Sequence, residues 1–234
     1  MEVQVAVAKV DRYAAINGGD TVEVIERPNG GVSIVLADGK LNGVNSKAIS
    51  MKVVHRTIGL ISESIQDGAA AKAVAKILYK ENAGQASASL NILSCDLQSN
   101  TIVITRCNPV PVMIIQGGNI NCLSSDCTLL GDNEDIKSSI YQIPLEGDIT
   151  IVLFTDGIFN AGQSEGITID LCTTLNALFQ EQDPTAQETA DFLLSQAINL
   201  DQNQPEDDMC VVVMQTIPQL NNPARRLSFR FPVI

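Results

Sequence analysis

Aspartate residues stand at the ends of three apolar runs in this sequence. Asp38 follows the run 32–37, Asp156 follows the run 149–155, and Asp207 with Asp208 precedes the run 209–214. Apolar runs of this length are typical of buried strands, so each carboxylate is expected at the end of a strand. If these strands lie side by side, the carboxylates crowd together and repel each other unless a cation lies among them. The pattern therefore predicts a metal site built from strand ends.

Glycine residues next to the carboxylates support this prediction. Asp38 and Asp156 each precede a glycine, and Gly18 and Gly19 precede a fourth carboxylate, Asp20. Glycine allows a sharp turn and the close approach of a ligand, although Asp-Gly after a strand is also common in ordinary turns. Oxygen ligands without histidine or cysteine favour Mg²⁺ or Mn²⁺, and these aspartates suffice for two ions. Two ions about 3.5–4 Å apart can lower the pKa of a shared water and align it with a phosphorus atom.

The composition argues against several other kinds of site. The 234 residues carry a net charge of -12, which disfavours nucleic acid as a partner. His55 is the single histidine and falls in a predicted helix, so a multi-histidine metal site is excluded. The six cysteines form no Cys-x-x-Cys motif and are predicted to be small apolar side chains. Neither the Rossmann nor the P-loop glycine motif occurs.

The N-terminal residues do not have the pattern of a signal peptide. The apolar stretch 3–10 is interrupted by Gln4 and Lys9, and the residue before it is Glu2 rather than a basic residue. No run approaches the length of about 18 apolar residues that a spanning helix needs. We therefore expect a soluble cytoplasmic protein that does not bind membranes.

Hydrophobic periodicity predicts the order of the elements. Strands are expected at 3–10, 21–25, 32–37, 86–93, 101–104, 112–115, 138–143, 149–154 and 209–214. Helices are expected at 44–66, 69–81, 164–180 and 186–199. Because helices and strands are segregated rather than alternating, the chain predicts an α+β fold in which two antiparallel sheets are stacked between helix pairs.

The chain is expected to form one domain over residues 1–217, followed by a tail over residues 218–234. Arg225, Arg226 and Arg230 concentrate positive charge in this tail, beside leucine and phenylalanine residues. The tail is predicted to be an extra edge strand or a flexible end, with a partner-binding arm as the alternative.

Taken in order, the motifs resemble those of the PP2C-type metal-dependent protein serine/threonine phosphatases. They are Gly19-Asp20, Ala37-Asp38-Gly39, Phe154-Thr155-Asp156-Gly157 and Asp207-Asp208-Met209, with weaker matches at 84–89 and 108–111. The resemblance spans residues 5–217 and is strongest to the bacterial branch of sporulation and stress regulators, the SpoIIE- and RsbU-like proteins. The short length looks most like that of the small stressosome phosphatases of the RsbX type.

The resemblance implies an αββα sandwich with two Mn²⁺ or Mg²⁺ ions in the cleft between the sheets. By this resemblance, the metal ligands would be Asp20, Asp38, the carbonyl group of Gly39, Asp156 and Asp207. Asp38 would bridge both ions and the metal-activated water. Asp208 would be an acceptor of hydrogen bonds behind the ligands.

The sequence also departs from the family pattern. The branch commonly has Gly-His-Gly after the Asp-Gly pair, whereas this chain has Lys40-Leu41-Asn42-Gly43. A histidine proposed as general acid in eukaryotic relatives is absent, so Lys40 is the candidate for protonating the leaving group, with an ordinary surface lysine as the alternative. For the phosphate-binding arginine of the family, Arg12 lies nearest to the expected region but has no clear motif match.

The function implied by the resemblance is hydrolysis of phosphoserine and phosphothreonine in proteins by direct attack of metal-activated water. Its substrates would be stressosome scaffold proteins. A rival hypothesis is a catalytically silent interaction module with the same fold, which Lys40 and Asn42 motivate. A phosphatase with an aspartyl nucleophile would need Asp-x-Asp at a strand end, and Asp156 stands alone in its motif.

Overall fold

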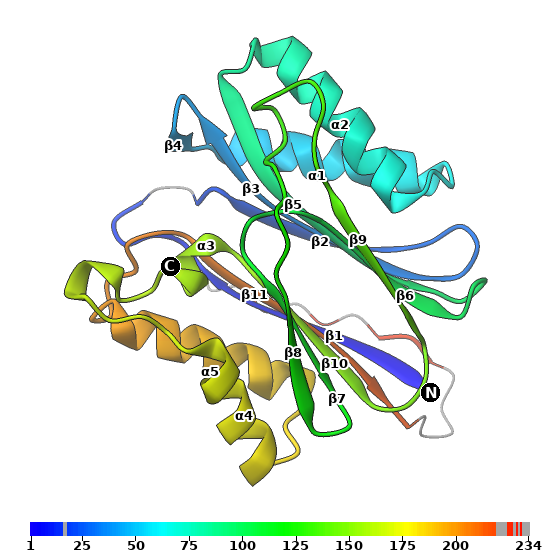
Figure 1. Cartoon of the computed structure of the whole chain (residues 1–234), viewed down its shortest axis with the longest axis vertical. Coiled ribbons are helices and arrows are strands. Elements are labelled where there is room, and N and C mark those ends of the chain that lie inside the picture. Colours follow the sequence, from blue (N-terminus) through cyan, green and yellow to red (C-terminus); the bar gives the residue numbers. More distant parts are fainter. Residues whose placement is uncertain (16–17, 219–223, 227, 229, 231–234) are drawn as a thin grey trace.

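In a computed structural model of the chain, two antiparallel β-sheets pack face to face, and helices cover the outer face of each sheet (Figure 1). The structure describes residues 1–15, 18–218, 224–226, 228 and 230. The layers therefore follow the order helices, sheet, sheet, helices, and the predicted αββα sandwich is confirmed.

The first sheet has the strand order β1-β11-β10-β7-β8, and each neighbouring pair is antiparallel. Its strands are β1 (Glu2–Val10), β7 (Val112–Gln116), β8 (Asn119–Leu123), β10 (Ile149–Phe154) and β11 (Met209–Ile217). Every residue of β10 is buried, because the strand lies in the middle of the sheet and both of its faces are covered.

The second sheet has the order β2-β3-β5-β6-β9, and the short strand β4 pairs with β3. Its strands are β2 (Asp20–Glu26), β3 (Gly31–Leu41), β4 (Val44–Asn45), β5 (Ala86–Asp96), β6 (Thr101–Cys107) and β9 (Ser139–Pro144). The strand β3 is longer than its predicted run 32–37. It continues through the Asp-Gly pair because β5 binds it along its whole length and β4 binds its last residues.

The helices are α1 (Lys47–Ser62), α2 (Asp67–Asn82), α3 (Asp156–Phe159), α4 (Leu171–Glu181) and α5 (Ala186–Leu200), with a 3₁₀ turn η1 (Gln163–Glu165). Helices α1 and α2 pack on the second sheet, and α5 packs on β1 and β11 of the first. Helix α5 begins with a capping box, in which Thr185 and Glu188 satisfy each other's backbone N–H groups.

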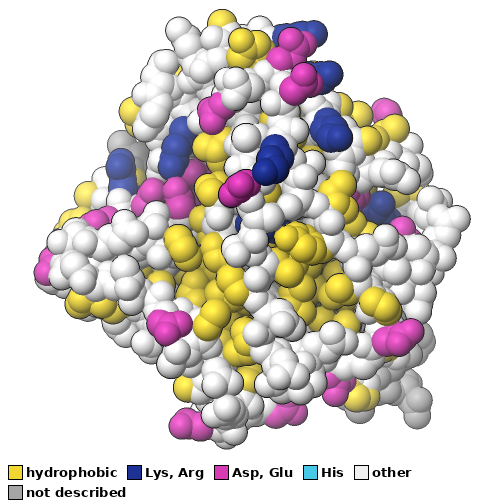
Figure 2. Space-filling model, viewed as in Figure 1, with side chains coloured by type: hydrophobic (Ala, Val, Ile, Leu, Met, Phe, Trp, Pro, Cys, Tyr) yellow, Lys and Arg dark blue, Asp and Glu magenta, His cyan; other side chains and the backbone are white. Residues whose placement is uncertain are grey.

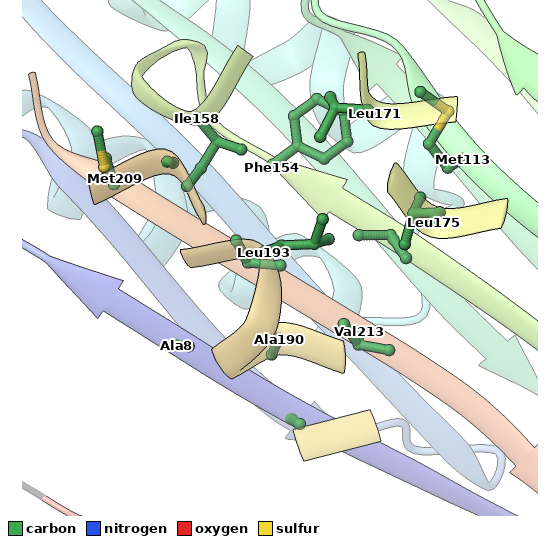
Figure 3. Packing of buried hydrophobic residues seen from close by; sticks show 14 of the residues in the cluster. Ala8, Met113, Phe154, Ile158, Leu171, Leu175, Ala190, Leu193, Met209 and Val213 are labelled. Atoms are coloured by element: carbon green, nitrogen blue, oxygen red, sulfur yellow. The ribbon is translucent and has the colours of Figure 1, made fainter. Parts of the chain in front are cut away.

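Apolar side chains fill the three spaces between the layers. Between the sheets lie residues such as Ile34, Leu36 and Val212, all of them buried. Figure 3 shows the layer between the first sheet and its helices, where Phe154 and Leu193 pack together with other apolar residues. Because apolar side chains pack against both faces of each sheet, the burial of apolar surface stabilises each sheet from both sides.

Several predicted boundaries were wrong. The helix predicted at 164–180 begins only at Leu171, since Gly162 and Gly166 have positive φ angles of 80° and 71° and the segment between them forms η1. The helix predicted from residue 44 begins at Lys47, because residues 44 and 45 form β4. The strand β8 and the short helix α3 were not predicted.

No helix in the described part of the chain is long and apolar enough to cross a membrane. Most of the predicted tail 218–234 lies outside the described residues. In its described part, Arg225 forms an exposed ion pair with Glu26 at the end of β2, with a distance of 2.6 Å from Nη1 to Oε2.

Candidate metal centre

Two of the predicted ligands lie opposite each other in one hairpin. Asp20 begins β2, and Asp38 lies near the end of β3; the two are direct partners in the antiparallel register. Directly opposite residues project their side chains on the same face of a sheet. Both residues are buried, with Asp20 at 2% and Asp38 at 6% exposure. The sequence-based premise was therefore only partly right, because Asp38 lies inside a strand rather than after its end.

The other two predicted ligands come from the first sheet. Asp156 follows β10 and begins α3, and Asp207 comes two residues before β11. The ammonium group of Lys40 joins the two sheets, since its Nζ atom lies 3.1 Å from Asp156 Oδ2 and 3.6 Å from Asp38 Oδ2. In the space-filling view, acidic and basic side chains adjoin each other in the region between β4 and α3 (Figure 2). The structure thus brings carboxylates from both sheets to one place.

Thr155 holds Asp20 from the first sheet. Its hydroxyl donates a hydrogen bond to Asp20 Oδ2 at 2.8 Å and accepts one from the backbone N–H of Cys210 at 3.0 Å. Thr155 is fully buried, so this link between the two sheets is shielded from water. Thr155 lies in the motif Phe154-Thr155-Asp156-Gly157, but a threonine at this position gave no reason to expect a hydrogen bond between the sheets.

Asp208 ties three segments of the chain together. Its Oδ1 atom accepts a hydrogen bond from the backbone N–H of Arg12 at 2.8 Å, and Oδ2 accepts one from the N–H of Gly19 at 2.6 Å. The side-chain amide of Asn45 donates to Asp208 Oδ2 at 2.9 Å and to Asp207 Oδ1 at 2.5 Å. Asp208 therefore fixes the loop that leads into Asp20. No sequence signal pointed to Asn45, which acts only because β4 pairs with β3.

Arg12 takes part in this network through its backbone. Its side chain, with Tyr13 and Glu206, lines a surface cavity of about 390 Å³. A second cavity, of about 70 Å³, lies at the carboxylates themselves and is lined by Asp38, Lys40, Ser87, Ala88, Ser89, Asn108, Pro109, Val110, Leu129 and Asp156. The weak sequence matches at 84–89 and 108–111 thus both contribute to the wall of this smaller cavity.

Gly39 has a packing requirement of its own. A Cβ atom at this position would lie 2.4 Å from the backbone nitrogen of Ser50, so a side chain would push α1 away from β3. The Gly39 carbonyl oxygen accepts a hydrogen bond from the N–H of Ser46 at 2.6 Å. A carbonyl oxygen has a second lone pair, which this bond leaves for another partner.

Burial and mutual repulsion dominate the electrostatics of the site. Burial, followed by the charge of Asp38, raises the pKa of Asp20 well above its usual value. Burial, followed by the charge of Asp156, raises the pKa of Asp38 to about 6. Burial alone would lower the pKa of Lys40, but the charges of Asp156 and Asp38 outweigh burial and raise it. The two aspartate pKa values are raised first by burial and then by neighbouring carboxylates, and Lys40 compensates this negative charge only in part.

The donor set fits a hard divalent cation. Asp20 Oδ1 and Asp38 Oδ1 are buried and have no hydrogen-bond partner, so each has an oxygen free to bind a cation. Carboxylate and carbonyl oxygens are the ligands that Mg²⁺ and Mn²⁺ prefer. Within the described ranges, however, no group of three or more His, Cys, Asp or Glu side chains is already arranged to hold a metal ion. The ammonium group of Lys40 lies between Asp38 and Asp156 and contacts both carboxylates.

The sequence is similar to a known protein family. The family model described as "Stage II sporulation protein E (SpoIIE)" matches residues 28–217. Stage II sporulation protein E of Priestia megaterium is 22% identical over 222 residues, which are 94% of this chain and 37% of that protein. The chain therefore spans little more than a third of the length of this relative.

Solved structures show the same architecture. The PP2C phosphatase domain with a fragment of the regulatory domain of SpoIIE from Bacillus subtilis matches with a TM-score of 0.75 and 21% identity, over 92% of this chain and 64% of that one. The catalytic domain of the serine threonine protein phosphatase PstP, in complex with two manganese ions, matches with a TM-score of 0.68 and 15% identity, over 91% and 97%. At these identities, the likeness shows that the chain has the PP2C fold.

Proposed function

The chain belongs to the SpoIIE family, and on this premise we propose that it is a divalent-metal-dependent phosphatase of phosphoserine and phosphothreonine in proteins. The observation that carries the proposal is the convergence of carboxylates from both sheets at one small cavity. Asp20 and Asp38 are almost fully buried and each has one oxygen atom without a hydrogen-bond partner, a cost that a bound cation would offset.

In this proposal, Asp20, Asp38, Asp156 and Asp207 would hold the metal ions, with the Gly39 carbonyl as a further oxygen ligand. When bound, divalent ions supply Lewis-acid catalysis by neutralising phosphate charge and lowering the pKa of water. The manganese-bound neighbour PstP supports this cofactor class, Mn²⁺ or Mg²⁺.

The chain's own residues position these groups. Thr155 holds one oxygen of Asp20 and leaves the other unpartnered. Asp208 and Asn45 fix the loop before β2 and the segment before β11, so that Asp20 and Asp207 come from anchored backbone. The amide of Asn108, in the wall of the small cavity, accepts the N–H of Val110 through its Oδ1 atom, which leaves its amino group to donate toward a phosphoryl oxygen.

Lys40 was predicted as a candidate proton donor to the leaving group. A general acid works best when its pKa lies near the operating pH. The carboxylates of Asp156 and Asp38 instead raise the pKa of Lys40 above its already high usual value. We therefore favour a role for Lys40 as a fixed positive charge rather than as a proton donor.

The substrate class rests on the resemblance to the RsbX type, from which we propose stressosome scaffold proteins. Phosphoserine or phosphothreonine on such a protein would enter the small cavity from its open side. The predicted cytoplasmic location and the absence of nucleic-acid partners belong to the same proposal.

A catalytically silent interaction module is the second candidate. The observation in its favour is that the Lys40 ammonium group lies between Asp38 and Asp156 and compensates part of their charge. A silent module would bind no Mn²⁺ in a calorimetric titration and would release no phosphate from any phosphopeptide.

Phosphate release from a generic phosphothreonine peptide, with Mn²⁺ and with a chelator, tests the proposed function. We expect activity with Mn²⁺, loss of activity with the chelator, and recovery when Mn²⁺ is restored. Asp38→Asn should abolish turnover while the circular dichroism spectrum stays unchanged. Asp126→Asn makes the same chemical change at a side chain that is 97% exposed and should leave turnover intact. Full activity of Asp38→Asn would refute the role of Asp38.

A further inference from the structure

Lys40 lies on the same face of β3 as Asp38, because the two residues are separated by one position in the strand. Its ammonium group contacts the carboxylates of Asp38 and Asp156, which come from different sheets. The positive charge therefore lies between two of the oxygen groups that a metal ion would use.

The backbone of Lys40 is held firmly. Lys40 pairs with Asn45 of β4 on one side and with Ser87 of β5 on the other. Asn42 and Gly43 close the β3–β4 hairpin as a two-residue turn with positive φ angles of 51° and 77°, which matches the twist of the strands. The position of the Cα atom of Lys40 is thus set by the sheet, independently of any cation.

The side chain of Lys40, by contrast, is only partly enclosed. It is 29% exposed, and it lines the small cavity next to the carboxylates. A lysine ammonium group is a compact charge on a flexible stem with four carbons, so it can leave the carboxylates without any change of the backbone. A divalent ion at the same oxygens would repel it at close range.

We propose that Lys40 is a resident cation that a divalent metal ion must displace from Asp38 and Asp156, so that this lysine sets the metal affinity of the site. This inference rests on the proposed function. It accounts for the position of the Lys40 ammonium group between carboxylates of the two sheets, one of which, Asp38, is buried. It also predicts that metal binding frees the ammonium group to face the small cavity.

Calorimetric titration of the chelator-treated protein with MnCl₂ tests the inference without any activity assay. Lys40→Met removes the charge and keeps most of the aliphatic stem, and we expect it to bind Mn²⁺ at least about tenfold more tightly than the wild type. Lys40→Arg keeps the charge and should bind no more tightly than the wild type. Lys52→Met is the matched control, since Lys52 of α1 also pairs with a carboxylate, that of Glu81 on α2, and lines neither cavity.

Thermal unfolding gives a second readout that also checks folding. Without metal, Lys40→Met should melt at a lower temperature than the wild type, because Asp38 and Asp156 lose their counter-charge. With Mn²⁺, its melting temperature should rise by more than that of the wild type, since tighter binding to the native state stabilises it more.

Each outcome bears on a specific claim. Tighter Mn²⁺ binding by Lys40→Met than by the wild type, with Lys52→Met equal to the wild type, would support the inference. Equal Mn²⁺ affinity of the wild type, Lys40→Met and Lys52→Met would overturn the inference and leave the metal-dependent phosphatase in place. Absence of Mn²⁺ binding in all three proteins would overturn both the inference and the proposed function.

Discussion

Replacing Asp208 with asparagine tests how the loop before Asp20 is held. In the native protein, Asp208 is 3% exposed and its carboxylate accepts hydrogen bonds from the N–H groups of Arg12 and Gly19 and from the amide of Asn45. An asparagine side chain has one acceptor oxygen in place of two. Its amino group must therefore face either the N–H of Arg12 or the two donors at the other oxygen.

The less costly orientation turns the amino group toward Arg12, because the backbone there is close to solvent and the Arg12 N–H can be hydrated. One hydrogen bond to a charged acceptor is then lost, which costs about 1.5–3 kcal/mol, and the bonds from Gly19 and Asn45 become weaker neutral ones. Relief of repulsion offsets part of this loss, since the charge of Asp208 is one cause of the raised pKa of Asp20. We expect a net decrease of about 2 kcal/mol in the free energy of unfolding.

Urea denaturation of the chelator-treated protein, followed by circular dichroism, measures this decrease. With a slope of about 2 kcal/mol per molar urea, the midpoint should fall by about 1 M. Asp126→Asn, at an exposed carboxylate, should change the free energy of unfolding by less than about 0.5 kcal/mol. An unchanged midpoint for Asp208→Asn, or an equal fall for Asp126→Asn, would show that the three hydrogen bonds do not stabilise the loop.

Two substitutions and one labelling experiment test the packing. Gly157→Ala should lower the free energy of unfolding by at least about 2 kcal/mol, because its Cβ atom would lie 2.2 Å from the backbone oxygen of Asp208. Gly59→Ala in α1, where a Cβ atom meets nothing within 4 Å, should raise it by about 0.5–1 kcal/mol, and the same urea titration distinguishes the two signs. Burial raises the pKa of the Cys107 thiol to about 12, so iodoacetamide at pH 8 should label exposed Cys122 in the native protein but not Cys107. Mass spectrometry reads the labelled residues, and labelling of Cys107 without denaturant would contradict its burial.

The fold could be predicted from the sequence because its elements are marked by clear periodicity. The buried strand β10 has a continuous apolar run, and the half-buried helix α1 has apolar residues at helical spacing. Both patterns follow from which faces are buried, so both can be seen in the sequence. The strand β8 was not predicted because its apolar residues do not alternate regularly: Ile120 and Leu123 are half-buried, whereas the other three residues are exposed. A strand of this kind forms because β7 offers a free edge, and that edge is a property of the whole sheet.

The candidate site could be predicted less completely. Asp20 and Asp38 were predicted as metal-ligand candidates because each lies next to an apolar run, although the reason given for Asp38 was incomplete. The strand β3 was expected to end at residue 37, since Asp-Gly is common in turns. Pairing with β4 and β5 overrides that preference and extends β3 to Leu41. That extension places Lys40 on the same face of β3 as Asp38. No local sequence pattern predicts the extension.

The two sheets supply separate halves of the site. Asp20 and Asp38 belong to the β2–β3 hairpin, whereas Asp156 and Asp207 belong to the sheet that contains β10 and β11. The apolar layer between the sheets and polar links such as the Thr155–Asp20 hydrogen bond and the Lys40–Asp156 ion pair keep these halves at a fixed distance. The distance between the two carboxylate pairs therefore depends on how the two sheets are aligned with each other. A ligand or substitution that slides one layer against the other would alter this spacing while each pair stays internally unchanged.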